Sequence, residues 1–312
     1  MTGRGASESP LGRVVLAISA YRSDEAVIAL LRGVFDSGAA PFGAVIVVDS
    51  LSTGRIAGEI GRQGWPVQFE NAETNLGSAG NLARRLALAA AGDADWCYTV
   101  NHDGEVDPAA VGRLLETARG QDRVGAVYPS RCYPNRGGTW DAGQRSLAPV
   151  PMRGLREPPD RDGEELTWSS SNGALYSLAP VRTGLTVWAD LWHGWEDMGY
   201  GWLLHRHGWR QLQSRDAIFN DTMEYRAIRL PGRVIHITDK PAWYSYYHLR
   251  NLILVTRRNR RGALGYLYIL MRAAQEVLIT VLWRGERRTR LRLLWAGARD
   301  GFAGRAGKGP VP

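Results

Sequence analysis

Short apolar runs alternate with amphipathic stretches along the first 130 residues of the chain. Five of these runs are rich in Val, Ile, Ala and aromatic residues, as is typical of strands buried in a sheet. They cover residues 13–20, 43–50, 66–71, 95–101 and 124–130. Stretches with helical spacing and capping residues lie between them, at residues 23–38, 77–92 and 107–120 and in a short segment after residue 50. This alternation predicts an α/β fold with a doubly wound, mostly parallel sheet.

The pattern changes after residue 130. Residues 131–165 are rich in Pro, Gly, Arg and Asp and predict a long loop, which is usually functional or disordered. Residues 166–178 predict a further strand and then a turn, and residues 192–210 predict a loop that enters a glycine-containing helix. Three long helices are expected at the end of the chain, over residues 241–262, 263–283 and 287–300.

The length of 312 residues suits one large domain with an appendage. We expect a disordered tail at 1–12, a domain at 13–240 with halves at 13–130 and 131–240, and a helical region at 241–312. The chain has two cysteines, Cys97 and Cys132, and no CxxC motif, which fits a reducing compartment. Cys97 lies in an apolar run and is expected to be buried. The first dozen residues lack an apolar signal-peptide core, so we expect a cytoplasmic protein.

Charge is distributed unevenly around the net value of +8. Residues 250–312 contain thirteen Arg and one Lys against three acids, whereas residues 1–249 contain 25 basic and 28 acidic residues. A mildly acidic body therefore carries a strongly basic end, which indicates an anionic partner, either lipid or nucleic acid.

The apolar run at 263–283 is long enough to span a bilayer, but Arg272, Gln275 and Glu276 lie near its middle. Each ionisable group at the bilayer centre costs roughly 2.5–3.5 kcal/mol on insertion scales, so we do not expect a spanning helix. Arginine clusters at 257–261 and 284–292 flank the run and favour an interfacial anchor on the anionic inner face of the cell membrane. We find no groove-entering motif and expect no nucleic-acid partner.

Polar side chains follow two of the predicted strands, at the edge where doubly wound sheets bind their ligands. Asp49 ends the second strand, and Asn101, His102 and Asp103 follow the fourth, with Asp107 four residues later. The alternative role for Asp103 is a helix cap, although Asp107 is better placed for one. The chain has neither GxGxxG after its first strand nor GxxxxGK[ST], which argues against a Rossmann dehydrogenase and a P-loop NTPase.

Several motifs occur in a specific order between residues 13 and 307. They are AYR, VVDS, NLGSAGN, NHD, SNGALYS, WEDMGYGWLLHRHGW and YYHLRN. Together they resemble the family 2 glycosyltransferases, inverting enzymes of the GT-A fold, and most of all those that transfer rhamnose or galactofuranose in bacterial cell-surface polysaccharide assembly. The resemblance implies a GT-A type sheet whose halves bind a nucleotide-sugar donor and a lipid-linked or polysaccharide acceptor. The arginine clusters around the apolar run add to this fold a C-terminal region that we expect to be helical, basic and membrane-associating.

The resemblance assigns chemistry to particular residues. Asp197 matches the general base that takes the proton of the acceptor hydroxyl, and Glu196 matches its acidic neighbour. Asp103 matches a ligand of Mg²⁺ or Mn²⁺ on the donor diphosphate, and His236 matches a histidine that completes the metal site. His193 is a weaker candidate than His236. The chain departs from the family in these motifs: Asn101 stands where an acid is usual, Gly199 where an acid is common, and Leu203 where an arginine is common.

The resemblance also assigns the two binding pockets. The donor pocket comprises Ala20, Tyr21, Arg22, Asp49, Asn75, Gly77, Gly80, Arg85, Asn101 and His102. In NLGSAGN, small residues let the backbone approach the nucleotide and Arg85 meets a phosphate, although Asn81 replaces a further glycine. The alternative for this segment is an ordinary loop-to-helix junction. The acceptor pocket comprises Trp192, Trp195, Asn172 and Gly173, with Trp202 nearby, and each of these tryptophans has a core role as its alternative.

A rival hypothesis is a catalytically weak, membrane-docked protein that binds nucleotides or glycans. The replacement of an acid by Asn101 favours it. A homo-oligomer is compatible with either hypothesis.

Overall fold

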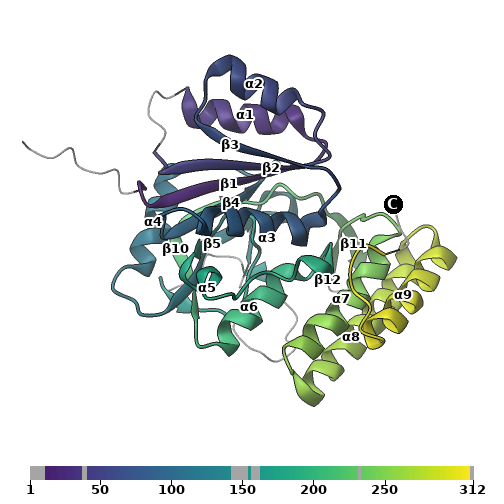
Figure 1. The fold of residues 1–312 in the computed structure, drawn as a ribbon. Coiled ribbons are helices and arrows are strands. Elements are labelled where there is room, and N and C mark those ends of the chain that lie inside the picture. The colour runs from purple at the N-terminus through teal and green to yellow at the C-terminus, as the bar shows by residue number, and fades with distance from the viewer. Residues whose placement is uncertain (1–10, 37–40, 142–153, 156–161, 231–232, 310–312) are drawn as a thin grey trace, which may run out of the picture.

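The computed structural model describes residues 11–36, 41–141, 154–155, 162–230 and 233–309. A mixed, mostly parallel sheet forms its centre, with strand order β3-β2-β1-β4-β9-β5-β10-β8 (Figure 1). These strands are β1 (Val14–Ala20), β2 (Ala44–Ser50), β3 (Val67–Ala72), β4 (Trp96–Asn101), β5 (Val124–Tyr133), β8 (Glu164–Glu165), β9 (Ala174–Ser177) and β10 (Arg210–Asn220). Strand β9 is antiparallel to both of its neighbours, β4 and β5.

The five strands predicted in the first 130 residues are confirmed, and β5 continues three residues further. The predicted loop at 131–165 contains the short strands β6 (Thr139–Asp141), β7 (Gly154–Leu155) and β8, while its residues 142–153 and 156–161 lie outside the described part. Within the range 166–178, where a strand and a turn were predicted, only the four residues of β9 form a strand. Sequence analysis missed β10 and the hairpin of β11 (Arg226–Leu230) and β12 (Arg233–Ile237).

Apolar side chains alternate along the inner strands and build a core on each face of the sheet. In β1, Leu16 and Ile18 face one core and Val15 and Ala17 face the other. The helices of the first core are α1 (Asp24–Phe35), α2 (Arg55–Gln63) and α4 (Pro108–Ala118). Those of the second core are α3 (Gly77–Ala90), α5 (Ala179–Arg182) and α6 (Glu196–Arg206). The α/β prediction is therefore confirmed, and buried Cys97 belongs to the second core.

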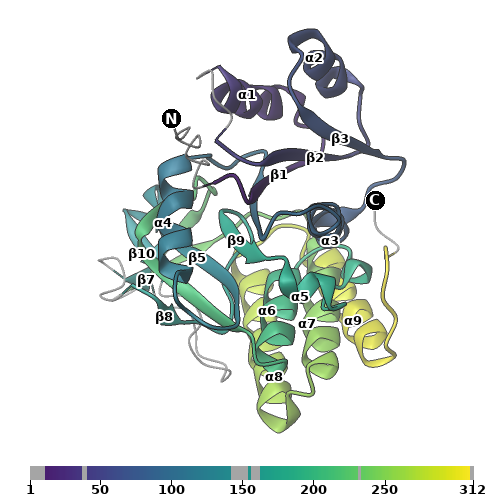
Figure 2. The same cartoon turned by 60° about the vertical axis from the view of Figure 1, so that its left-hand side comes forward.

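Three helices follow the sheet and pack together beside α6: α7 (Tyr244–Arg258), α8 (Gly262–Trp283) and α9 (Arg287–Phe302) (Figures 1 and 2). Met198 and Trp202 of α6 share an apolar cluster with Leu252 and Val255 of α7. Helix α7 is buried along most of its length because it packs against both α8 and α9. The three predicted C-terminal helices are confirmed.

Candidate active site

The carboxyl ends of β1, β2 and β4 meet at one edge of the sheet. The parallel register pairs Ala20 with Asp49, and Ser19 with Asn101. The Ser19 hydroxyl donates a hydrogen bond to Oδ1 of Asn101 at 3.2 Å. Tyr21 and Arg22 follow β1 as exposed side chains, with the guanidinium of Arg22 5.3 Å from the ring centroid of Tyr21.

Asp49 is buried at this edge, and one of its carboxylate oxygens has no hydrogen-bond partner. Burial raises the pKa of Asp49, while a hydrogen bond from Ser52 opposes the increase. A buried acceptor without a partner is costly, so a donor group on a ligand would be favoured here.

Two of the acids that follow β4, Asp103 and Asp107, differ in their surroundings. Asp107 caps α4, since its Oδ1 accepts a hydrogen bond from the backbone N–H of Ala109 at 2.9 Å. The prediction of Asp107 as the cap is confirmed. Asp103 is exposed on the preceding turn, which a 2.9 Å hydrogen bond from Gly104 N–H to Asn101 O closes. Asn172 also holds this turn, because its Oδ1 accepts from the backbone N–H of Asn101 at 2.9 Å.

Gly173 needs to be glycine for two reasons. Its φ is +83°, a conformation that favours glycine, and an added Cβ would lie 2.4 Å from the ring of Phe219. Both members of the predicted Asn172–Gly173 pair therefore shape the backbone next to β4.

Arg131 lies beside the candidate site, and sequence analysis gave it no role. It is almost completely buried, donates to the backbone oxygen of Asn172, and forms an ion pair with Asp221 at 2.9 Å. Its charge also acts to lower the pKa of Asp197. Arg131 is the first residue of the predicted loop at 131–165. Arginines are frequent in that stretch, so nothing in the sequence indicates that this one is buried.

The start of α3 packs against the loop before α6. The backbone N–H of Ala79 donates to Trp192 O at 3.1 Å, and the indole of Trp192 donates to Asn75 O, also at 3.1 Å. Gly77 has φ +67°, and an added Cβ would lie 2.0 Å from Trp192 O. Gly77 thus makes room for the chain's own Trp192, whereas sequence analysis expected it to make room for a nucleotide.

Arg85 and Asn81 point into the protein rather than toward the sheet edge. Arg85 is 2% exposed and donates from one guanidinium nitrogen to Ala17 O at 2.9 Å and Val100 O at 3.1 Å. Burial lowers its pKa to about 10. Asn81 donates to Val48 O at 2.9 Å. The expectation that Arg85 meets a donor phosphate does not match this position, because the side chain is committed to carbonyls of β1 and β4.

Glu196 and Asp197 form the first turn of α6, and the loop before them is fixed from α7. The side-chain amide of Asn251 donates to Leu191 O, His193 O and Gly194 O at 2.9, 2.7 and 3.0 Å. Arg250 donates to the same Leu191 O at 2.8 Å. Three hydrogen bonds from one buried amide leave this loop little freedom. The YYHLRN motif contains both residues, although sequence analysis gave them no role.

The paired carboxyls have unusual acidity. Burial and the neighbouring charge of Glu196 raise the pKa of Asp197 to about 7, with hydrogen bonding from Ser171 acting in the opposite direction. Burial also raises the pKa of Glu196, against a hydrogen bond from Ser78. The Ser78 hydroxyl lies 3.1 Å from Nδ1 of His193, whose pKa burial lowers to about 4. His193 is therefore neutral near pH 7.

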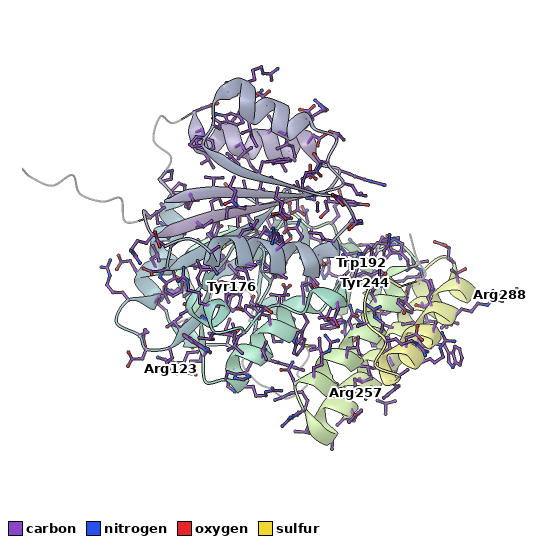
Figure 3. The ribbon with its side chains drawn as sticks, in the orientation of Figure 1. Arg123, Tyr176, Trp192, Tyr244, Arg257 and Arg288 are labelled. Carbon is purple, nitrogen blue, oxygen red and sulfur yellow. The ribbon has the colours of Figure 1, made fainter. Side chains whose placement is uncertain are left out.

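The predicted acceptor tryptophans divide into packed and partly exposed side chains. Trp192 is 7% exposed and packs on Tyr247 with ring centroids 4.7 Å apart; Trp202 is 5% exposed. Figure 3 shows Trp192 at the junction of the sheet and the C-terminal helices, next to Tyr244. Both rings are therefore packed in the core, which is the alternative that the sequence analysis gives for these tryptophans. Trp195 is partly exposed, and its indole donates to His248 O at 2.8 Å.

The predicted metal ligands do not form a ready-made cage. Within the described ranges no three His, Cys, Asp or Glu side chains gather closely enough to hold a metal ion. His236 lies on β12, where burial and the charge of Arg136 lower its pKa. Mg²⁺ is commonly held by one or two carboxylates together with substrate phosphates. The exposed Asp103 carboxylate fits a cation shared with a diphosphate in this way.

Comparison with solved structures identifies the architecture. The mannosyltransferase PcManGT from Pyrobaculum calidifontis, in complex with GDP-Man and Mn²⁺, has a TM-score of 0.55 at 11% identity over 96% of this chain and 90% of that chain. S. aureus TarS 1-349 has a TM-score of 0.58 at 12% identity, over 92% and 80% of the two chains. Its complex with UDP-GlcNAc has a TM-score of 0.58 at 10% identity, over 94% and 88%. The chain has a GT-A-like fold.

At these identities the likeness concerns the fold alone. No protein-family model and no curated protein matches the chain. The GT-A part of the fold prediction is confirmed, and the chemistry of the site has to be argued from its own residues.

Proposed function

We propose that the protein is a glycosyltransferase that moves a sugar from a nucleotide-sugar donor to a lipid-linked or polysaccharide acceptor with inversion. The observation that carries the proposal is Asp197, a carboxyl with a pKa of about 7 at the start of a fixed helix. A general base is most effective when its pKa lies near the working pH. The GT-A-like fold supports the same class of reaction, since PcManGT and TarS were crystallised with GDP-Man and UDP-GlcNAc.

The transfer is a single displacement in which Asp197 handles the proton. The acceptor hydroxyl oxygen attacks C1 of the donor sugar, the bond from C1 to the diphosphate oxygen breaks, and Asp197 takes the hydroxyl proton. The nucleoside diphosphate leaves with the electron pair. Because the attack comes from the face opposite the leaving group, the configuration at C1 inverts.

The sheet edge supplies the donor pocket in this proposal. Tyr21 and Arg22 are exposed there for base or phosphate contacts, and Asp49 offers a buried acceptor for a ribose hydroxyl. Asn101 and His102 line the end of β4. Mg²⁺ or Mn²⁺, held by Asp103, would neutralise the charge of the departing diphosphate. Glu196 and Trp195 would orient the acceptor beside Asp197.

An assay for nucleoside diphosphate release tests the proposal. The donors are GDP-mannose, UDP-GlcNAc and nucleotide-activated rhamnose and galactofuranose, each with and without Mn²⁺. Metal-stimulated release with at least one donor, lost in Asp197→Asn, is expected. Donor binding by calorimetry without release from any donor would instead favour the rival hypothesis of a binding protein, to which the absence of an acid at position 101 points.

A further inference from the structure

Helix α8 exposes most of its large apolar side chains and buries Glu276 and Thr280 beside Ile269 and Ile279, whereas a surface helix of a soluble protein exposes polar side chains. Nine of the sixteen exposed large apolar side chains in the described part of the chain lie on this helix. They are Leu264, Tyr266, Leu267, Leu270, Met271, Val277, Leu278, Val281 and Leu282, each 40–66% exposed. The described residues contain this one helix that is long and apolar enough to cross a membrane.

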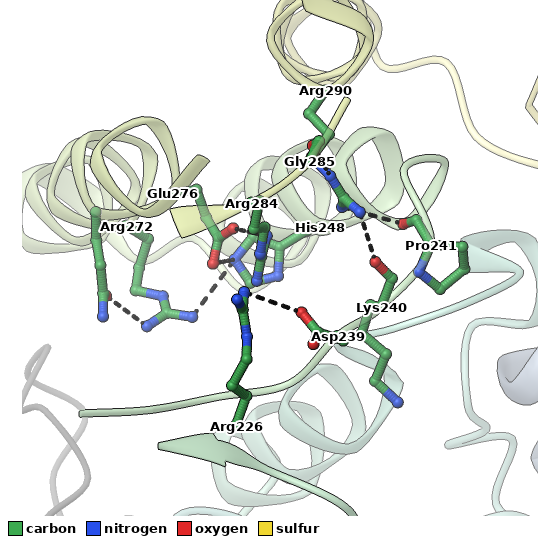
Figure 4. Close-up of polar contacts among 11 residues, drawn as sticks. Arg226, Asp239, Lys240, Pro241, His248, Arg272, Glu276, Arg284, Gly285 and Arg290 are labelled. Atoms are coloured by element: carbon green, nitrogen blue, oxygen red, sulfur yellow. Dashed lines mark hydrogen bonds and ion pairs between the residues drawn. The ribbon is translucent and has the colours of Figure 1, made fainter. Parts of the chain in front are cut away.

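The charged residues of α8 point inward. Glu276 is 8% exposed and pairs with Arg284 at 2.7 Å, and its other oxygen lies 3.8 Å from Nε2 of His248 on α7 (Figure 4). Arg272 bonds to Gln275 at 2.7 Å and approaches His248 at 3.4 Å. Glu276 is therefore buried against α7 and Arg272 is half-buried, whereas Gln275 is exposed next to a side of the helix that is otherwise largely apolar.

Helix α9 presents a different exposed stripe, in which arginines and aromatic rings share one side. The stripe consists of Arg288, Arg292, Trp295, Arg299 and Phe302, spaced by four, three, four and three positions. Trp295 is 67% exposed and Phe302 is 54% exposed. Figure 3 shows Arg288 at the outer margin of α9. Tryptophan and arginine side by side are typical of groups that sit at the headgroup level of a bilayer.

The acids of this region contribute little negative surface. Residues 250–312 contain three acids, of which Glu276 and Asp300 are buried and paired with arginines. Glu286 is the exposed one. The apolar face of α8 therefore lies between exposed arginines, with Arg260 before its first turn and Arg287 and Arg288 after its last.

We propose that the exposed sides of α8 and α9 form a docking surface for an anionic lipid bilayer. Helix α8, about 33 Å long at 1.5 Å per residue, lies along the membrane plane with its apolar side among the acyl chains. The flanking arginines contact anionic headgroups. The inference rests on this surface alone and holds whatever reaction the site performs.

Two other occupants fit the surface less well. A second copy would bring the same arginine clusters toward each other, and like charges at close range repel. A spanning helix would have to remove its Glu276 side from α7 and expose the buried charges to lipid. An anionic bilayer satisfies both the apolar side and the arginines.

Vesicle co-sedimentation of the full chain tests this proposal. The vesicles are phosphatidylcholine alone or phosphatidylcholine mixed with phosphatidylglycerol, over a salt series. We expect binding to the mixed vesicles, weaker binding to the neutral ones, and a decline with salt to a residual level, because exposed charges are screened within about 10 Å at 0.1 M. Equal pelleting with both lipids at low salt, or none with either, would overturn the proposal.

Two pairs of variants locate the contact. Leu270→Gln with Leu278→Gln should lower the partition coefficient by at least about tenfold, since each buried leucine contributes substantially to transfer from water. Ile218→Gln with Val234→Gln, which also replaces two exposed apolar residues, should leave it unchanged. Arg288→Gln with Arg292→Gln should make vesicle binding depend less on salt concentration. Arg55→Gln with Arg62→Gln on α2 is the control for charge and should leave the salt dependence of vesicle binding unchanged.

All four double variants should melt at the temperature of the parent chain, because the side chains that they replace are exposed. Light scattering after gel filtration provides the remaining check. A stable dimer that dissociates in the α8 leucine variant, together with no vesicle binding, would assign this face to a second copy and contradict the proposal.

Discussion

In the proposed mechanism, Asp197 combines the role of general base with an energetic cost to the fold. A carboxyl with a pKa of about 4 in the unfolded chain and about 7 in the folded protein binds more protons when folded. Its contribution to stability is therefore greatest at low pH and is lost as the pH rises through the folded pKa. The charged form of Asp197 that the proposed mechanism needs is the form that the fold disfavours.

Replacing Asp197 should separate activity from stability. Asp197→Asn is expected to lower kcat/KM by the ~10²–10⁴-fold typical of a positioned base. The same variant should unfold at a higher temperature than the parent above pH 7, because the cost of a buried charge is removed. Initial rates of diphosphate release and thermal melts across pH 5–9 measure both. Parent-like transfer by the variant would exclude Asp197 as the base.

The pH profile gives an independent check on the same carboxyl. In the parent, kcat/KM should rise with pH through about 7, because Asp197 must be deprotonated to accept a proton. Glu196→Gln removes the adjacent negative charge that raises this pKa, so the midpoint should move to lower pH.

Asp103 and Asp107 form a matched pair for testing the metal. Asp103→Asn should remove the metal-dependent part of nucleotide-sugar binding, because it replaces the exposed carboxylate at the sheet edge. Asp107→Asn removes the same charge from the same loop but keeps a capping side chain, so donor binding and stability should change little. Calorimetric titrations with and without Mn²⁺ compare the two. Equal effects of both substitutions would mean that Asp103 is not a specific ligand.

At the residue scale, the sequence indicates chemistry that is local and misjudges side chains whose partners are distant. Asp107 was identifiable as a cap because its partner is two residues away. Arg85 and Trp192 were assigned to ligands because nothing nearby in the sequence reveals that Arg85 binds carbonyls of β1 and β4, or that Trp192 packs on Tyr247. Arg131 went unnoticed for the same reason.

At the scale of elements, the missed strand β10 has a physical explanation. Its buried Gln211 donates to Thr167 O and Gly201 O at 2.8 Å each and accepts from the Tyr128 hydroxyl at 2.9 Å. A fully hydrogen-bonded buried amide fits a core, yet it looks polar in a hydrophobic pattern. The inner strands β1, β2 and β4 were predictable because, apart from Thr99 and the terminal Asp49 and Ser50, their buried side chains are mainly apolar on both faces.

The junction between α3 and the loop before α6 allows a test with glycines. Gly77→Ala should lower the free energy of unfolding by roughly 1–3 kcal/mol, since φ +67° and the approach of Trp192 O leave no room for a methyl group. Gly112→Ala is the control, because its added methyl meets nothing within 4 Å in the middle of α4. It should raise stability by about 0.5–1 kcal/mol. Urea denaturation measures both, and a stable Gly77→Ala protein would show that this contact is dispensable.

At the scale of the whole molecule, α8 touches the candidate site as well as the proposed membrane surface. Trp195 immediately precedes Glu196 and packs against Tyr268 of α8, with ring centroids 6.5 Å apart. The guanidinium of Arg272 lies 5.7 Å from the Trp195 ring. Tyr268 and Arg272 of α8 thus support the loop before Asp197, while the exposed apolar side chains of this helix remain available for lipid. A docked α8 would hold the carboxyl pair in a fixed relation to the bilayer.

This arrangement predicts that docking matters for acceptors in a membrane and not for the chemistry itself. The acceptor is first identified by repeating the diphosphate-release assay with candidate lipid-linked acceptors. Leu270→Gln with Leu278→Gln should then slow transfer to acceptor in anionic vesicles by roughly 10²-fold, because confinement to one surface raises the effective concentration of the two partners. Transfer to the same acceptor in neutral detergent micelles should stay near the parent rate, since Trp195 and Asp197 are untouched. Initial rates in the two settings give the comparison. An equal loss in micelles would mean that the leucines act through the site and not through the membrane.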